Sequence, residues 1–123
     1  MENDREKFKA EFRNRIYKWV LRLIDFIETL PRSPAGQVMG RQLLRSGTSV
    51  LANYVEAGSA SSRKDFINFF THSLKSADES LVWLSLLRDT KKGDAKECQW
   101  LSKEVEEIAN VLASAILKLK GKR

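Results

Sequence analysis

Residues 101–119, LSKEVEEIANVLASAILKL, decide the fold class of this chain. Apolar side chains recur in this stretch in steps of four, three, four, three and four residues. The spacing places them on one stripe of an α-helix, in a heptad-like pattern that is typical of helices packed side by side. Asp94, three residues before Glu97, resembles a helix start, so we expect a helix over residues 95–119. Its stripe is Leu101, Val105, Ile108, Leu112, Ala115 and Leu119.

Three stretches upstream have the same helical period. Residues 5–30 place their apolar side chains three or four residues apart, and Pro31 ends the helix because proline cannot continue one. Residues 35–57 form a second predicted helix, which begins after Ser33, a suitable N-cap residue. The stripe of residues 5–30 is Phe8, Phe12, Ile16, Trp19, Leu23, Phe26 and Leu30, and that of residues 35–57 is Leu43, Leu44, Gly47, Val50, Leu51 and Tyr54.

Glycine and serine mark the remaining boundaries. Gly58 is placed as the C-cap of the second helix, and Ser62 is followed three residues later by Asp65, as in a capping box. Residues 62–90 are therefore the third predicted helix. Its stripe is Phe66, Phe70, Ser73 or Leu74, Ala77, Leu81, Leu84 and Arg88. Gly47 lowers helix propensity, and its benefit would be the close approach of a neighbouring helix.

We predict an all-α fold from this pattern. Short connections between long helices favour antiparallel neighbours, hence a single up-down-up-down four-helix bundle. The bundle would occupy residues 1–123 as one domain, with helices at about 5–30, 35–57, 62–90 and 95–119.

Composition narrows the class of protein. Hydrophobic residues make up 42% and charged residues 31% of the 123 residues, which indicates a globular chain. The one cysteine, Cys98, cannot form an internal disulfide, so we expect a cytoplasmic protein. We expect no membrane span, because the best apolar run, residues 16–27, is interrupted by Lys18, Arg22 and Asp25. The net charge of +6 suggests nucleic acid or another anionic partner, although it also suits solubility alone.

Residues for catalysis are scarce. The sequence holds one histidine, His72, and one cysteine, whereas zinc and di-iron sites need several ligands. A Cys98–His72 nucleophile pair is the single chemical candidate, but Cys98 lies in an ordinary first helical turn. We expect no metal, no cofactor and no enzymatic activity.

Two of the predicted helices have more apolar surface than one bundle core needs. Because a bundle helix normally buries one face, the additional residues suggest an interface between subunits of a homo-oligomer. A wide contact within one chain is the alternative. The candidate interface residues are Tyr17, Val20, Leu21, Ile24, Val82, Trp83 and Leu86.

Polar residues form a row on the second predicted helix and a matching row on the third. If the rows meet, Arg45 could pair with Glu79 or with Glu56, and the network would fix the register of the helices. A ligand site and a solvent-facing row are the alternatives to this structural interpretation. This polar seam consists of Gln42, Arg45, Ser49, Asn53, Glu56, Ser76 and Glu79.

Basic residues give the most specific functional hypothesis, which is binding to the phosphates of RNA or DNA. We expect no stacking of bases, because no aromatic residue is clearly interleaved with exposed basic ones. An adaptor that binds another protein is the alternative. The candidate phosphate contacts are Arg15, Lys18, Arg22, Arg41, Arg63, Lys64, Lys120, Lys122 and Arg123.

The polar seam, together with the residues that follow it, also carries a family resemblance. Gln42-x-x-Arg45-x-x-x-Ser49-x-x-x-Asn53-x-x-Glu56-x-Gly58, then Phe66-x-x-Phe69 and Ser76-x-x-Glu79, resembles the 23S ribosomal-RNA intervening-sequence protein family of four-helix bundles. In shape, the retroelement accessory variability determinant is a more distant relative. The resemblance implies a pentameric ring without known catalysis that binds nucleic acid through basic surface. In the accessory proteins it implies association with a reverse transcriptase.

Overall fold

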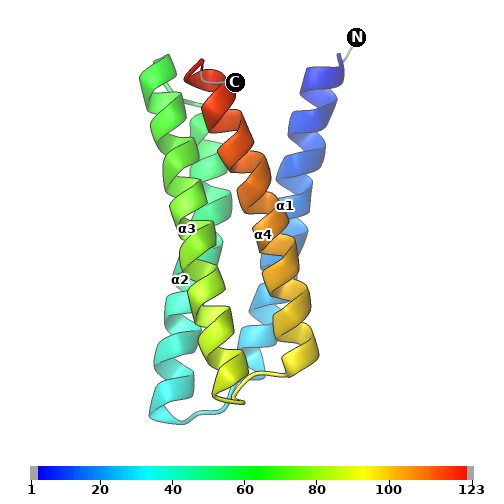
Figure 1. Cartoon of the computed structure of the whole chain (residues 1–123), viewed down its shortest axis with the longest axis vertical. Coiled ribbons are helices and arrows are strands. Elements are labelled where there is room, and N and C mark those ends of the chain that lie inside the picture. Colours follow the sequence, from blue (N-terminus) through cyan, green and yellow to red (C-terminus); the bar gives the residue numbers. More distant parts are fainter. Residues whose placement is uncertain (1–2, 122–123) are drawn as a thin grey trace.

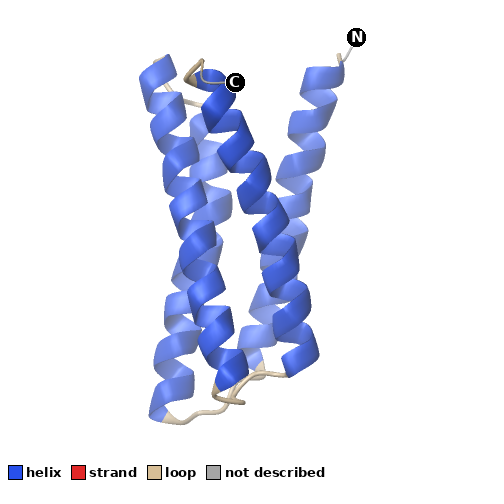
Figure 2. Ribbon diagram, viewed as in Figure 1, coloured by secondary structure: helices blue, strands red, loops and turns tan. Residues whose placement is uncertain are grey.

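The computed structural model describes residues 3–121, which form four α-helices and no strand within that range. They are α1 (Asp4–Glu28), α2 (Pro34–Ala57), α3 (Arg63–Asp89) and α4 (Ala95–Leu119), as labelled in Figure 1. No end differs from its predicted position by more than two residues. Figure 2 shows that the rest of the described chain consists of short loops.

Local caps explain where the helices begin. The side chains of Ser33, Ser62 and Asp94 each accept a hydrogen bond from the backbone N–H three residues further on, as the sequence predicts. Gly58 follows α2 as predicted, but its φ of −64° is right-handed, so it does not form the left-handed glycine cap.

Each helix packs against two neighbours. α2 lies against α1 and α3, and α4 lies against α3 and α1, so α1 is diagonal to α3 and α2 to α4. Figure 1 shows the loops at residues 29–33 and 90–94 at the bottom of the bundle. Both ends of the described chain lie at the top, and there α1 diverges from α4. We call this top end, formed by the first turns of α1 and α3 and the last turns of α2 and α4, the open end.

The core runs between the four helices. The predicted stripe of α4 is buried from Leu101 to Leu112, and α1 contributes Ile16 and Leu23, which have no exposed surface. Trp19 joins α1 to α4, because its indole Nε1 donates a hydrogen bond to the carbonyl oxygen of Leu101 at 3.0 Å.

The predicted stripes differ from the observed core at several positions. Phe8 and Leu44 are 56% and 38% exposed, whereas Leu87, which we did not place on a stripe, is fully buried. Phe8 belongs to the first two turns of α1, at the open end, where Figure 1 shows that α1 diverges from α4. The period places each residue on a face of its helix, but the position of the neighbouring helix decides which face is covered.

Gly47 allows α1 and α2 to approach closely, as the sequence predicts. A Cβ atom at this position would lie 2.2 Å from Leu23 Cδ2 and 3.5 Å from the ring of Trp19. A side chain here would therefore force the two helices apart or distort the core.

Among the described residues, none of the helices has the length and apolar content that a membrane span requires.

Candidate nucleic-acid interface

Arg15, the first predicted phosphate contact, is paired within the chain. Its Nε lies 2.7 Å from Glu104 Oε2, and its terminal nitrogen lies 2.9 Å from Glu107 Oε1. The hydrogen bond to Glu104 is the main cause that raises the pKa of Arg15, and the same contact lowers the pKa of Glu104. The positive charge of Arg15 is thus balanced by two carboxylates of α4.

Arg22 is also engaged with α4. It donates hydrogen bonds to both carboxylate oxygens of Glu97, the shortest at 2.7 Å, and this contact raises the pKa of Arg22. Its guanidinium carbon lies 3.7 Å from the ring centroid of Trp100, which is a cation–π contact. Arg15 and Arg22 therefore fasten α1 to α4, and a phosphate would have to compete with these glutamates.

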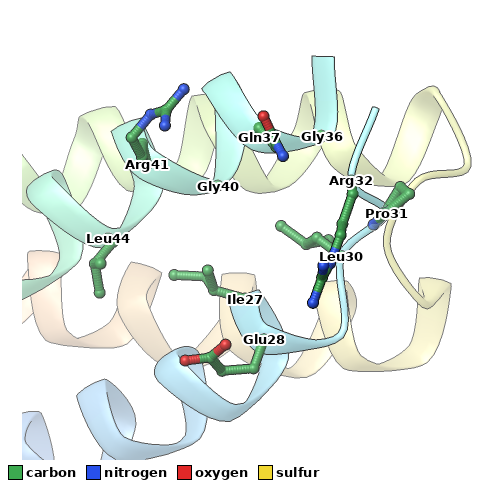
Figure 3. A pocket seen from close by; sticks show the side chains of 10 residues that line it. All are labelled: Ile27, Glu28, Leu30, Pro31, Arg32, Gly36, Gln37, Gly40, Arg41 and Leu44. Atoms are coloured by element: carbon green, nitrogen blue, oxygen red, sulfur yellow. The ribbon is translucent and has the colours of Figure 1, made fainter. Parts of the chain in front are cut away.

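Lys18 and Arg41 are exposed and form no ion pair with a described carboxylate. Arg41 lines a surface hollow of about 320 Å³ between the end of α1 and the start of α2. Figure 3 shows Ile27 and Leu30 between the two helices, whereas Arg41 points away from them. Glu28 and Arg32 also line this hollow, so it has charges of both signs.

The remaining described candidates lie together at the open end. Arg63 and Lys64 from the first turn of α3, and Lys120 just after α4, line a single surface hollow that has no carboxylate in its wall. Arg63 also donates a hydrogen bond to the carbonyl oxygen of Leu119, which holds α3 against the end of α4. Lys122 and Arg123 lie outside the described residues.

A neighbouring hollow at the open end was not predicted. It has a volume of about 450 Å³, and five aromatic side chains line it together with four basic ones. We call it the aromatic cleft. Its rings are Phe8, Phe12, Tyr54, Phe66 and Phe70, and its basic residues are Arg5, Lys9, Arg63 and Lys118.

The aromatic cleft corrects our expectation that aromatic and basic residues are not interleaved. Phe8 lies between Arg5 and Lys9 in the sequence and is more than half exposed. The sequence signal was present, but the regular stripe led us to place Phe8 in the core. Arg5, Lys9 and Lys118 were missed because each is an unremarkable surface charge until the four helices are assembled.

The polar seam forms in part. Arg45 donates hydrogen bonds to Gln42 Oε1 and to Glu79, and Glu79 Oε2 also accepts one from Trp83 Nε1 at 2.9 Å. Of the two partners we considered for Arg45, the structure thus places Glu79 beside it. Asn53 instead donates to the carbonyl oxygen of Ser49 in its own helix. The side chains of Ser49, Glu56 and Ser76 take no part in the network.

A second polar contact between α2 and α3 is buried and was not predicted. The Oγ atoms of Ser46 and Ser80 lie 2.8 Å apart, and Ser73 Oγ donates to the carbonyl oxygen of Val50 at 2.7 Å. All three serines have no exposed surface. Small hydroxyl residues at these positions allow the two helices to pack closely while every buried polar atom keeps a partner.

The candidate interface residues divide between surface and core. Tyr17 and Leu21 on α1, and Val82 and Leu86 on α3, are exposed. Ile24 and Trp83 are partly buried. Val20 is 6% exposed and belongs to the core of its own chain, which corrects its assignment to an interface between subunits.

The residues considered for catalysis lie apart. Cys98 is buried in the first turn of α4, and this burial is the main cause that raises the pKa of its thiol. His72 is exposed on α3, and about 25 Å of helix separates it from the end of α3 that leads to α4. Within residues 3–121 no three His, Cys, Asp or Glu residues form a group that could hold a metal ion.

Comparison with known proteins gives a family. The chain matches the family described as 23S rRNA-intervening sequence protein over residues 9–114. It is also similar to the crystal structure of a protein of unknown function from the S23 ribosomal protein family of Bacteroides thetaiotaomicron VPI-5482. The two chains share 34% sequence identity with a TM-score of 0.80, and the match covers 85% of this chain and 97% of the other. No curated protein matches this chain.

Proposed function

The chain belongs to the 23S rRNA-intervening sequence protein family, and we propose that it is a non-enzymatic, cytoplasmic protein that binds nucleic acid. In this proposal an antiparallel up-down-up-down bundle assembles into a closed ring and presents its open end to the phosphates. Short loops, and the position of both described chain ends at the same end of Figure 1, support the antiparallel order.

One observation carries the proposal. Basic side chains from α1, α3 and α4 line two adjoining hollows at the open end, and neither hollow has a carboxylate in its wall. None of these residues forms an ion pair with a described carboxylate, in contrast to Arg15 and Arg22. Unpaired cations close together attract a polyanion and release its counterions. They are Arg5, Lys9, Arg63, Lys64, Lys118 and Lys120.

The exposed apolar residues support assembly into a ring. Tyr17 and Leu21 lie on α1, Val82 and Leu86 lie on α3, and these two helices are diagonal to each other in the bundle. One protomer thus has exposed apolar residues on two helices that do not contact each other. If the α1 patch of one protomer binds the α3 patch of the next, repetition of this contact gives a ring when the rotation between protomers closes, and an open filament when it does not. The family resemblance suggests five protomers, and a ring would multiply weak phosphate contacts.

The test has two parts. Light scattering at low and high salt should give one mass, near five protomers, at both salts. Fluorescence anisotropy with labelled RNA and DNA should then show an affinity that falls steeply as salt rises. The double variant Lys64→Gln/Lys120→Gln should weaken binding and flatten the salt dependence. The matched control Lys18→Gln/Arg41→Gln removes two charges outside the two hollows and should have a much smaller effect on both.

A protein-interaction adaptor, for example an accessory subunit of a reverse transcriptase, is the second candidate. The same exposed apolar residues on α1 and α3 favour it, because they could bind a different protein. A monomeric mass, together with no salt-dependent binding of RNA or DNA, would replace the first proposal by this one.

A further inference from the structure

The rings of the aromatic cleft form a continuous series of contacts across three helices. The ring centroids of Phe12 and Tyr54 are 5.2 Å apart, those of Tyr54 and Phe70 are 5.5 Å apart, and those of Phe70 and Phe66 are 4.7 Å apart. Phe8 extends the series at 6.1 Å from Phe12, with the two rings nearly parallel. Such edge and face contacts hold each ring in a defined orientation.

The cleft is open to solvent rather than closed by side chains. Phe8 continues the core stripe of α1, yet more than half of its surface is exposed. Covering such an exposed apolar ring with another group is favourable, because it removes apolar surface from water. The volume of about 450 Å³ falls in the range of small-molecule sites, so the cleft has room for a flat ring.

Arg63 links this cleft to the basic hollow beside it. It lines the aromatic cleft with Lys118, and it lines the second hollow with Lys64 and Lys120. Its bond to the carbonyl oxygen of Leu119 fixes the side chain at the junction of the two hollows. A chain of alternating phosphates and rings could therefore follow one path past Arg63.

We propose that the protein binds single-stranded nucleic acid, with an unpaired base in the aromatic cleft and the neighbouring phosphates on Arg63, Lys64 and Lys120. This inference rests on the proposed function and adds a preference for single strands over duplexes. Bases in a duplex are already stacked and paired, so they cannot enter the cleft without an unstacking cost. Stacking on an aromatic ring accepts any base, so the preference is for strandedness and not for sequence.

Two features favour this occupant over a small amphiphilic acid. The cations are spread over α1, α3 and α4 instead of surrounding one point, which suits a polyanion better than a single carboxylate. The wall of the cleft also consists largely of rings, which offer flat faces for stacking on a planar base. Burial raises the pKa of Tyr54, whose hydroxyl group is 3.4 Å from the carbonyl oxygen of Lys9, so this ring adds no negative charge to the wall at neutral pH.

The test compares three anionic probes of equal length by fluorescence anisotropy. They are a 20-nucleotide oligouridine, the duplex of that strand with oligoadenosine, and a 20-unit abasic strand that keeps the phosphates but has no bases. Phe8→Leu and Phe66→Leu remove a ring and keep an apolar side chain. Trp100→Leu is the matched control, because Trp100 is an exposed aromatic residue outside the cleft.

We expect the oligouridine to bind more tightly than the duplex or the abasic strand. Phe8→Leu should weaken the binding of oligouridine about tenfold and leave the affinities for the duplex and the abasic strand unchanged. The salt slope, which is the slope of log binding constant against log salt concentration, should also stay the same. Arg63→Gln should weaken the binding of all three probes and reduce the magnitude of the salt slope for the single strand by about 0.7. Trp100→Leu should change nothing, and circular dichroism should show that every variant remains folded.

Two results would overturn the inference, and they differ from failure of the proposed function. If all probes bind and Phe8→Leu and Phe66→Leu leave every affinity unchanged, the base does not enter the cleft although nucleic acid binds. If Phe8→Leu weakens the three probes equally, the ring acts on the fold of the open end and not on a base. If no probe binds at low salt, the proposed function itself is wrong.

Discussion

Gly47 of α2 lies directly against Leu23 of α1, so closely that a Cβ atom at position 47 would be 2.2 Å from Leu23 Cδ2. Leu23 has no exposed surface, and the ring of Trp19 lies beyond it. This contact sets the distance between α1 and α2, and it gives the first of four predictions.

Gly47→Ala should lower the free energy of unfolding by about 1 kcal/mol. Overpacking costs about 1–3 kcal/mol, and it has to exceed the gain of about 1 kcal/mol in helix propensity. Leu23→Ala/Gly47→Ala should be more stable than the sum of the single changes implies, because the shorter side chain makes room. Urea denaturation measures the cycle, and strict additivity would show that the contact does not limit the packing.

Trp19→Phe should destabilise the protein by about 2 kcal/mol. The change removes the hydrogen bond from Nε1 to the carbonyl oxygen of Leu101 and leaves space in a buried site. Trp100→Phe is the matched control, since Trp100 is exposed, and its effect should be much smaller. Equal losses in thermal unfolding of the two variants would mean that the buried indole contact does not stabilise the bundle.

Glu104→Gln should destabilise the protein at neutral pH but not in acid. Arg15 lowers the pKa of Glu104 below its ordinary value of 4.5, so the folded state binds this proton more weakly than the unfolded chain does. The stabilisation, about 1 kcal/mol for a partly exposed pair, is complete above about pH 5 and disappears as the pH falls through the folded-state pKa.

Glu107→Gln provides the control for this pH dependence. Glu107 contacts the same arginine, but its side chain is 51% exposed, so its removal should have a smaller effect at every pH. Urea denaturation of the wild type and both variants at several pH values from 3 to 7 measures the free energy of unfolding that each glutamate contributes. A constant difference between the wild type and Glu104→Gln down to pH 3 would contradict the assignment.

Mixing two variants should separate a ring contact from a symmetric dimer contact. Leu21→Asp blocks the α1 patch and Val82→Asp blocks the α3 patch, and both side chains are exposed, so the fold should survive. Each variant alone should be monomeric. An equimolar mixture should have the mass of two protomers, because one intact α1 patch can bind one intact α3 patch while the other two patches are blocked.

Light scattering on the mixture provides the readout. If the wild type is oligomeric and each variant alone is dimeric, the intact patch of each variant binds its own copy, and the ring geometry is wrong. If the mixture stays monomeric, the α1 patch does not bind the α3 patch. If both variants keep the wild-type mass, the exposed apolar residues on α1 and α3 are not the interface.

Much of the fold could be predicted because its signals are local. A cap such as Ser62 needs information from three residues, and the stripe from Leu101 to Leu112 follows from the helical period. The family assignment was also within reach, since the spaced polar residues around Arg45 and Glu79 form a recognisable pattern, and the match over residues 9–114 confirms it.

The candidate site could not be predicted in the same way, because it is assembled from distant residues. Phe8, Tyr54 and Phe66 come from three helices, and each of them is on an ordinary apolar stripe. Only the assembled bundle places Phe8 in one hollow with Arg63 of α3 and Lys118 of α4. Likewise, nothing local shows that Val20 faces the core or that Glu97 balances Arg22.

The divergence of α1 also has a consequence for local stability. Residues 4–11 form the first two turns of α1, and every one of them is exposed. Opening a helix end that buries so little surface costs much less free energy than unfolding the bundle, so the amide hydrogens of these turns should exchange with solvent early. A molecule that held Phe8 in place would slow this exchange, and the N-terminal amides would thus report on occupancy of a cleft whose other walls are far away in the sequence.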